Sequence, residues 1–150
     1  MTNVDGMTKP KARIVFADSG SFGDDGTVLV QEGPPEKRGY DLEERTARFG
    51  EAVIDFAKTV PQNSLTSRLI SQLVGARISI GANCVEADDA VSTKEFLKNI
   101  GTCRKEARET KHFLRMVVRA VPGIKPEAGK LWLEANELHL IFSKIWRTRT

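Results

Sequence analysis

The sequence has little cysteine, and its apolar runs are too short to cross a membrane. Its only cysteines, Cys84 and Cys103, form neither a CxxC pair nor a disulfide-dense pattern. Both lie in apolar helical segments, so we expect two reduced core thiols. No apolar run approaches the roughly 18–20 residues that span a bilayer, and residues 1–10 lack the apolar region of a secretory signal. These absences predict a cytoplasmic chain without a membrane partner.

Catalytic signatures are missing too. The two histidines, His112 and His139, have no serine or cysteine partner in a recognisable nucleophile motif. The glycines at 20–26 form neither a GxGxxG motif nor a P-loop. Glu109 and His112 have the ExxH spacing of di-iron bundles, but a second such motif is absent, and Thr110 is the inward residue. We therefore predict no catalytic residues, no metal and no cofactor.

Charge is divided unevenly along the chain. The 150 residues carry a net charge of +3. Residues 1–40 hold five basic and six acidic residues, and residues 41–90 hold five and eight. Residues 91–150 hold thirteen basic and six acidic residues, a net charge of +7. Such an asymmetry can mark an anionic partner.

Residues 1–39 differ from the rest in their many glycines and prolines. Two β-prone runs, 13–16 and 27–30, could pair as a hairpin, but an isolated hairpin is marginal in water. We predict a flexible N-terminal tail, with a docking or partner-binding strand as the alternative.

Residues 40–147 have the apolar spacing of four helices. The first begins at Asp41, with Glu44 at capping-box spacing, and ends at Pro61. The second runs from Ser64 and fades near residues 86–90; Ser92 caps the third, Pro122-Gly123 ends it, and the fourth follows Pro126. The predicted core stripes are Leu42, Phe49, Val53, Phe56 and Val60; Leu69, Leu73, Ala76 and Ile80; Phe96, Ile100, Cys103, Ala107, Thr110, Leu114, Val117 and Val121; and Leu131, Ala135, Leu138, Phe142 and Ile145. Short connections predict an all-α, antiparallel up-and-down four-helix bundle.

Several segments resemble the four helix bundle protein family, also called 23S ribosomal RNA intervening-sequence proteins. They are Asp41-Leu42-Glu43, Ser71-Gln72-Leu73, Ser92 to Leu97, Lys105 to Lys111 and Glu134 to Leu138. The resemblance covers residues 40–147, and the motifs recur in order. It implies a small non-enzymatic bundle that assembles into a ring-like homo-oligomer, commonly a pentamer. A related bundle acts with a reverse transcriptase and RNA, so RNA or a nucleic-acid-processing protein is an expected partner. The family's biochemical role is largely undefined.

The predicted third helix carries a basic face turned away from its core stripe. Its members are Lys94, Lys98, Arg104, Lys105, Arg108, Lys111, Arg115 and Arg119. Such a face could contact successive phosphates without sequence preference. A solvated face or a subunit contact is the alternative, because Glu106 and Glu109 neutralise part of it. No aromatic residues interleave with the basic ones along this helix, which argues against a stacking platform.

Two further features bear on assembly. Asn83 continues the apolar stripe beyond Ile80, with Glu86 three residues later, so we predict a partner for Asn83 between helices or across a subunit boundary. Six large apolar residues lie beside the core stripes, and a single bundle would leave some of them exposed: Ile70, Val74, Ile78, Trp132, Ile141 and Trp146. We predict self-association. The function that follows is an oligomeric binding protein, and a scaffold that binds only proteins is the alternative.

Overall fold

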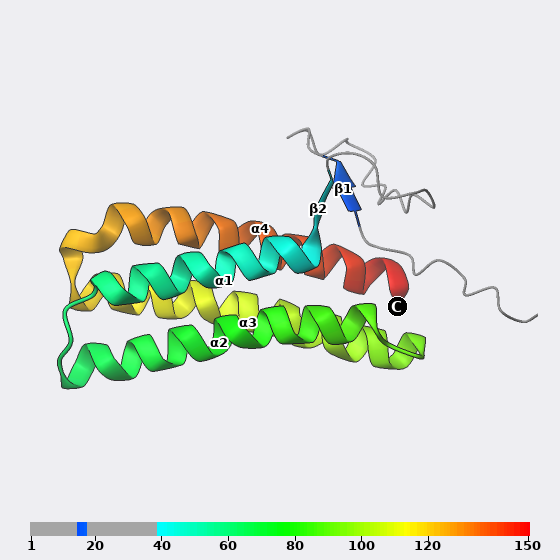
Figure 1. Ribbon diagram of the computed structural model, residues 1–150, viewed down its shortest axis with the longest axis horizontal. Coiled ribbons are helices and arrows are strands. Elements are labelled where there is room, and N and C mark those ends of the chain that lie inside the picture. The colour runs from blue at the N-terminus through cyan, green and yellow to red at the C-terminus, as the bar shows by residue number, and fades with distance from the viewer. Residues whose placement is uncertain (1–14, 18–38) are drawn as a thin grey trace, which may run out of the picture.

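Four antiparallel helices form an up-and-down bundle, as predicted (Figure 1). The computed structural model describes residues 15–17 and 39–150. The helices are α1 (Leu42–Thr59), α2 (Ser64–Asp88), α3 (Thr93–Ala120) and α4 (Lys125–Arg149), and a short 3₁₀ turn at Pro122–Ile124 joins the last two. No helix among the described residues is long and apolar enough to span a membrane.

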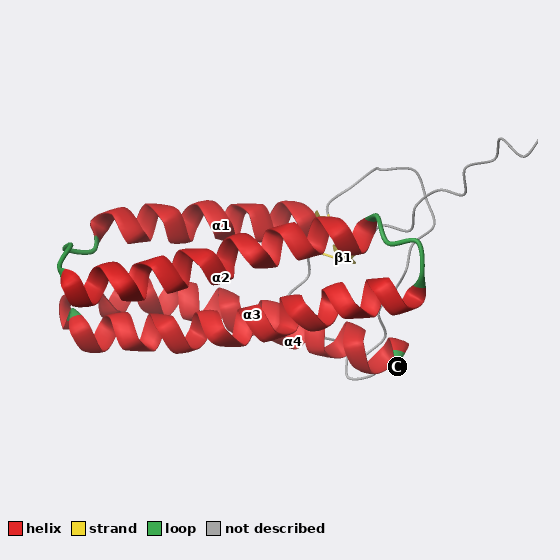
Figure 2. Ribbon diagram, turned by 90° about the horizontal axis from the view of Figure 1, so that it is seen from below, coloured by secondary structure: helices red, strands yellow, loops and turns green. Residues whose placement is uncertain are grey.

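Each helix packs beside its neighbours in the chain, and α4 returns to α1 to close the bundle (Figure 2). Contact is most extensive where α3 meets α2 and α4, and least extensive between α1 and α4. Helix α1 has 18 residues and α3 has 28, a difference of ten residues, or about 15 Å of helix. Helices α2 and α3 therefore run on past the start of α1 (Figure 1).

The predicted core stripes form the interior of the bundle. Every predicted core residue of α1 is buried, and so are those of α3 and α4 except Phe96, Val121 and Leu131, which are half-buried. Helix α2 is rotated slightly from the prediction: Leu69 is half-buried, whereas Ile70 is buried. Cys84 and Cys103 are both buried, as predicted, and form no disulfide, and burial raises the pKa of the Cys103 thiol.

Polar side chains cap the starts of α2 and α3. Asn63 caps α2 by accepting from the backbone N–H groups of Leu65 and Thr66, and the Thr66 hydroxyl accepts from the Asn63 N–H in return. Ser92 caps α3, as predicted, by accepting from the N–H of Glu95 at 3.1 Å. The Glu95 carboxylate accepts from the N–H of Val91 at 3.1 Å. These caps satisfy donors that a helix N-terminus otherwise leaves unpaired.

The start of the bundle carries a small strand pair. Val15–Ala17 (β1) pairs antiparallel with Gly39–Asp41 (β2), with Val15 opposite Asp41. The predicted run at 13–16 is thus partly a strand, but its partner is β2, which leads directly into α1. The predicted partner, 27–30, lies outside the described residues, as does the capping side chain of Asp41.

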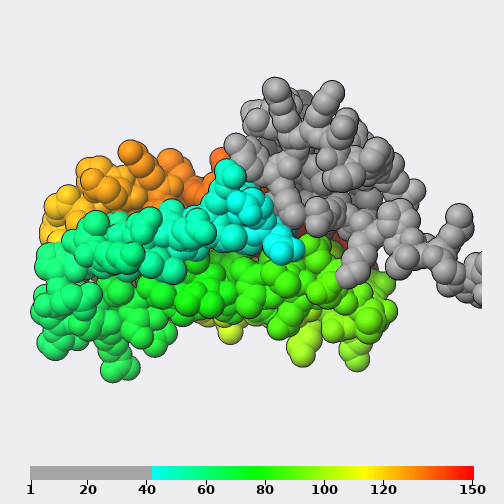
Figure 3. All heavy atoms as spheres, viewed as in Figure 1, coloured from blue at the N-terminus to red at the C-terminus, as the bar shows by residue number. Residues whose placement is uncertain are grey.

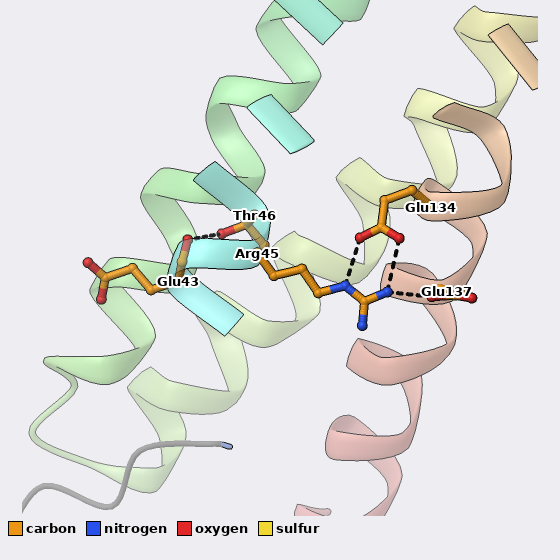
Figure 4. A network of polar contacts seen from close by, with 5 residues as sticks. All are labelled: Glu43, Arg45, Thr46, Glu134 and Glu137. Carbon is orange, nitrogen blue, oxygen red and sulfur yellow. Dashed lines mark hydrogen bonds and ion pairs between the residues drawn. The ribbon is translucent and has the colours of Figure 1, made fainter. Parts of the chain in front are cut away.

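Arg45 joins α1 to α4. Its Nε donates to Glu134 Oε1 at 2.7 Å and its Nη2 to Glu134 Oε2 at 2.9 Å, a two-pronged pair (Figure 4). The same Nη2 also reaches Glu137, one turn further along α4. Charge-assisted hydrogen bonds therefore stabilise the contact between α1 and α4, which is the smallest contact between neighbouring helices of the bundle.

A second arginine lies between α1 and α2 in very different surroundings. Arg77 of α2 is 1% exposed, and none of its three side-chain nitrogens has a hydrogen-bond partner among the described residues. Its guanidinium lies over the Phe49 ring at 4.8 Å. Side chains of α1 and α2 lie side by side on one face of the bundle (Figure 3). Burial lowers the pKa of Arg77 to about 10.

Candidate nucleic-acid interface

The eight predicted basic residues divide into an exposed row and a half-buried pair. The exposed row is Lys94, Lys98, Lys105, Arg108, Arg115 and Arg119. Arg104 and Lys111 are half-buried and turn towards α4.

An open groove of about 720 Å³ lies between α3 and α4 and gathers four of these cations. Helix α3 lines it with Lys98, Gly101, Thr102, Arg104, Lys105 and Arg108, and α4 with His139, Ser143 and Trp146. No acidic residue is among these lining residues. The other four predicted cations, Lys94, Lys111, Arg115 and Arg119, lie outside the lining. The groove therefore gathers positive charge between Lys94 at the start of the predicted face and Arg115 and Arg119 near its end.

Acidic neighbours offset only part of this charge. Lys105 Nζ is 3.8 Å from Glu109 Oε1, but both side chains are well exposed, so the pair is weak. Burial, followed by the nearby Glu109, raises the pKa of Glu106, with Lys105 opposing the shift. Among the described residues, neither Lys98 nor Arg108 forms an ion pair. These cations are available to an anion from solvent.

His139 lies beside the groove in a cationic environment. Lys111 Nζ donates to Asn136 Oδ1 at 3.0 Å and lies 3.3 Å from His139 Nδ1. Burial lowers the pKa of His139, and nearby Lys111, Arg104 and Arg108 lower it further. Burial and then Arg108 also lower the pKa of Lys111. A neutral His139 that accepts at Nδ1 keeps its proton on Nε2 as a donor.

Sequence reasoning missed the aromatic residues of this surface. The Arg104 Cζ lies 5.1 Å from the Trp146 ring, and Lys111 Nζ lies 5.5 Å from the Trp132 ring. Phe96 and Phe113 of α3 pack partly against the core, and α4 supplies two tryptophans beside the cations. The signal was available: in an antiparallel pair folded at Pro122–Ile124, Gly101 and Trp146 are nearly equally far from the turn.

Asn83 and Glu86 lie outside this groove. Asn83 Nδ2 donates to the Ser79 carbonyl at 2.8 Å and to Ser79 Oγ at 3.2 Å, so its partner in this chain lies in its own helix and not between helices; the alternative, a partner across a subunit boundary, stays a prediction. Cys84 takes the core position after Ile80, because a step of four residues keeps that face inward. Glu86 is exposed. An assembly role for either residue stays a prediction.

The placement of the other predicted residues is mixed. Thr110 is buried and inward, while His112 is exposed. Across the described residues, no three His, Cys, Asp or Glu side chains converge as a metal site would need. Of the six apolar residues expected beside the core, some of them exposed, Ile78 and Trp132 are exposed, whereas Ile70 and Ile141 are buried within the bundle.

Large apolar side chains nevertheless remain exposed on two helices. Ile78 and Val85 of α2 are 58% and 41% exposed, and Leu133 and Leu140 of α4 are 63% and 51% exposed. Each pair is spaced by seven residues, so its members lie on one side of their helix. Helices α2 and α4 are not neighbours in the bundle, so the two apolar faces are separate surfaces.

Comparison with known proteins identifies a structural neighbour. No protein-family model and no curated protein matches the sequence. The chain is similar in structure to a crystallised protein of unknown function from the S23 ribosomal protein family of Bacteroides thetaiotaomicron. The TM-score is 0.63 at 20% identity, over 70% of this chain and 97% of that one. The neighbour is consistent with the predicted family resemblance, and at this identity it shows a shared four-helix fold.

Proposed function

We propose that this chain is a non-enzymatic, self-associating bundle that binds nucleic acid, with structured RNA as the first candidate, through the basic surface of α3. The observation that carries the proposal is the α3–α4 groove, which gathers Lys98, Arg104, Lys105 and Arg108 without an acidic residue in its lining. Phosphates that replace the counterions of such a surface release them to solvent, which favours binding at low salt. The remaining predicted cations extend the surface along α3.

The test is RNA and DNA binding across a salt series, with charge removed from the groove. The groove variant is Lys98→Gln/Lys105→Gln/Arg108→Gln. The control is Lys58→Gln/Arg68→Gln/Lys130→Gln, which removes the same charge from exposed positions elsewhere. If all three groove cations contact duplex phosphates, the slope of log K against log salt falls by about 2 to 3 in the groove variant. We expect the control to change the slope little.

Two outcomes would contradict nucleic-acid binding by the groove. Equal losses in both triple variants would mean that net charge, not this surface, attracts the polymer. Absence of binding by the wild type at low salt would favour the alternative function, a scaffold that binds only proteins and in which the basic face supports subunit contacts.

Self-association is supported by the two exposed apolar faces. Because they lie on two helices that are not neighbours in the bundle, the α2 face of one copy can meet the α4 face of the next. A contact between two different faces is heterologous and closes into a ring when its rotation permits. The family resemblance suggests five subunits. Exposed apolar area of this kind commonly marks an interface.

Sedimentation velocity on two single variants tests this arrangement. Ile78→Glu blocks the α2 face and Leu140→Glu blocks the α4 face, so we expect either change to give monomers. A mixture retains one intact face on each variant and is expected to form a heterodimer. Monomers from the wild type at micromolar concentration, or no heterodimer in the mixture, would overturn the head-to-tail contact.

A further inference from the structure

The Trp146 ring packs against α3 at Gly101, where only glycine leaves enough space for it. The side chain is half-buried and lines the groove. A Cβ built on Gly101 would lie 2.8 Å from Cζ3 of the indole and 3.3 Å from its Cε3, closer than side-chain carbons pack. A larger residue at 101 would therefore push the ring away. Glycine brings an aromatic ring against the backbone of a cationic helix.

Arg104 lies over the Trp146 ring, and the two side chains form a stacked pair. Its Cζ lies 5.1 Å from the centre of the Trp146 ring, within the range of a cation–π contact. Both a guanidinium plane and an indole ring can stack on a nucleic-acid base. The Trp146–Arg104 pair can therefore be extended by one more planar group, and an unpaired base is such a group.

The rest of the groove fits the other parts of a nucleotide. Lys98, Lys105 and Arg108 are exposed, carry long side chains and line the same space, so they can reach phosphates on either side of a stacked base. His139 and Ser143 add hydrogen-bonding groups on the α4 side. The groove of about 720 Å³ is within the usual size of small-molecule sites.

We propose that the α3–α4 groove receives an unpaired nucleotide, with its base on the Trp146–Arg104 stack and the adjoining phosphates on Lys98, Lys105 and Arg108. The inference rests on the proposed function, because the same cations carry both. It goes further in its ligand: a duplex keeps its bases stacked inside and cannot offer one to Trp146. The groove should thus prefer single-stranded segments, loops or ends.

Fluorescence of Trp146 reports the event directly. The chain has two tryptophans, so Trp132→Phe leaves Trp146 as the sole indole. Three probes with equal phosphate number are compared at one salt concentration: decauridylate, an RNA duplex and inorganic polyphosphate. Base stacking on an aromatic predicts roughly five-fold or tighter binding of decauridylate than of the duplex. It also predicts quenching of Trp146 by decauridylate alone.

Two variants separate the contribution of the Trp146 ring from that of the cations. Both are made in the full chain, and their assembly is checked. Gly101→Ala keeps every cation and both tryptophans but displaces the Trp146 ring, and alanine favours the helix. Trp146→Leu removes the ring, and Trp132→Leu on the same helix is the matched control. We expect Gly101→Ala and Trp146→Leu, but not Trp132→Leu, to bind decauridylate no more tightly than the duplex, because the base contact is lost while the phosphate contacts remain.

The outcomes distinguish this inference from the proposed function. Equal binding of all three probes, without quenching, would overturn the nucleotide site and leave phosphate binding by α3 in place. A single-strand preference that survives in Gly101→Ala and Trp146→Leu would also overturn it. If no probe binds at low salt, the proposed function fails and the nucleotide site fails with it.

Discussion

Each of the two contacts that α1 makes with a neighbouring helix contains an arginine, and the surroundings of the two arginines differ sharply. Arg45, on its α4 side, is partly exposed and shared by the carboxylates of Glu134 and Glu137. Hydrogen bonding to Glu134 raises the pKa of Arg45 against the opposing effect of burial. Arg77, on its α2 side, is almost fully buried and has no hydrogen-bond acceptor. Burial lowers its pKa to about 10.

The comparison separates the cost of burying a charge from the benefit of pairing it. A guanidinium with a bidentate carboxylate recovers much of its lost hydration. A guanidinium against an aromatic ring recovers less, because a cation–π contact replaces none of the five N–H hydrogen bonds to water. The α1–α4 contact is small but electrostatically satisfied. The α1–α2 contact contains an uncompensated charge.

The largest expected effect is stabilisation by Arg77→Met. Methionine fills much of the arginine stem and removes the desolvated charge, so the free energy of unfolding should rise by about 3 kcal/mol. Urea unfolding at fixed protein concentration measures the change. Arg68→Met, at an exposed position of the same helix, is the control and should stay within about 0.5 kcal/mol.

The pH dependence of this difference identifies its cause. With a folded-state pKa of about 10 against 12.5 for the ordinary group, Arg77 loses its proton in the folded state first. The penalty is complete below pH 10 and declines between 10 and 12.5. The advantage of Arg77→Met should therefore shrink by about 1 kcal/mol between pH 10 and 11. A destabilising Arg77→Met would instead mean that an anion pairs with this arginine in solution.

A smaller, opposite effect is expected at Arg45. Arg45→Met leaves the half-buried Glu134 without its bidentate partner, which should cost about 1 kcal/mol; partial exposure reduces the loss below that of a buried pair. Arg48→Met breaks an exposed pair with Glu44 within α1 and should cost less than about 0.5 kcal/mol. Denaturant unfolding with and without added salt measures both changes. Equal losses for the two variants would contradict a special role for the α1–α4 pair.

The bundle was predictable from sequence because its core stripes on α1, α3 and α4 repeat at steps of three and four. Helix α2 was harder, since apolar residues lie on both of its sides. Its inward face could be drawn through Leu69 or through Ile70, and packing selects Ile70. Arg77 follows Ile70 by seven residues and is carried into the core by that rotation. No local pattern marks an arginine for burial.

The cations of the candidate site were predictable from the sequence, but the groove that some of them line was not. The eight cations follow from the outward positions of α3 in the heptad repeat. Which four of them line the groove depends on which α4 residues lie opposite, and that depends on helix register. Trp146 enters the groove only because Gly101 leaves room for it across the helix contact. A property of two helices together cannot be found along either one.

The smallest expected effect is the pH response of His139. Its charged neighbours Lys111, Arg104 and Arg108 are all cations. Burial and these cations hold its pKa below the ordinary 6.5. As pH falls below 6.5 the unfolded chain gains the proton first, so the bundle loses stability until the folded-state pKa is passed. A phosphate in the groove would reverse this by favouring the protonated ring. Wild type should therefore lose thermal stability between pH 7.5 and 5 relative to His139→Gln, while RNA binding tightens more in wild type. A pH response shared equally by His139→Gln would assign both effects to other groups.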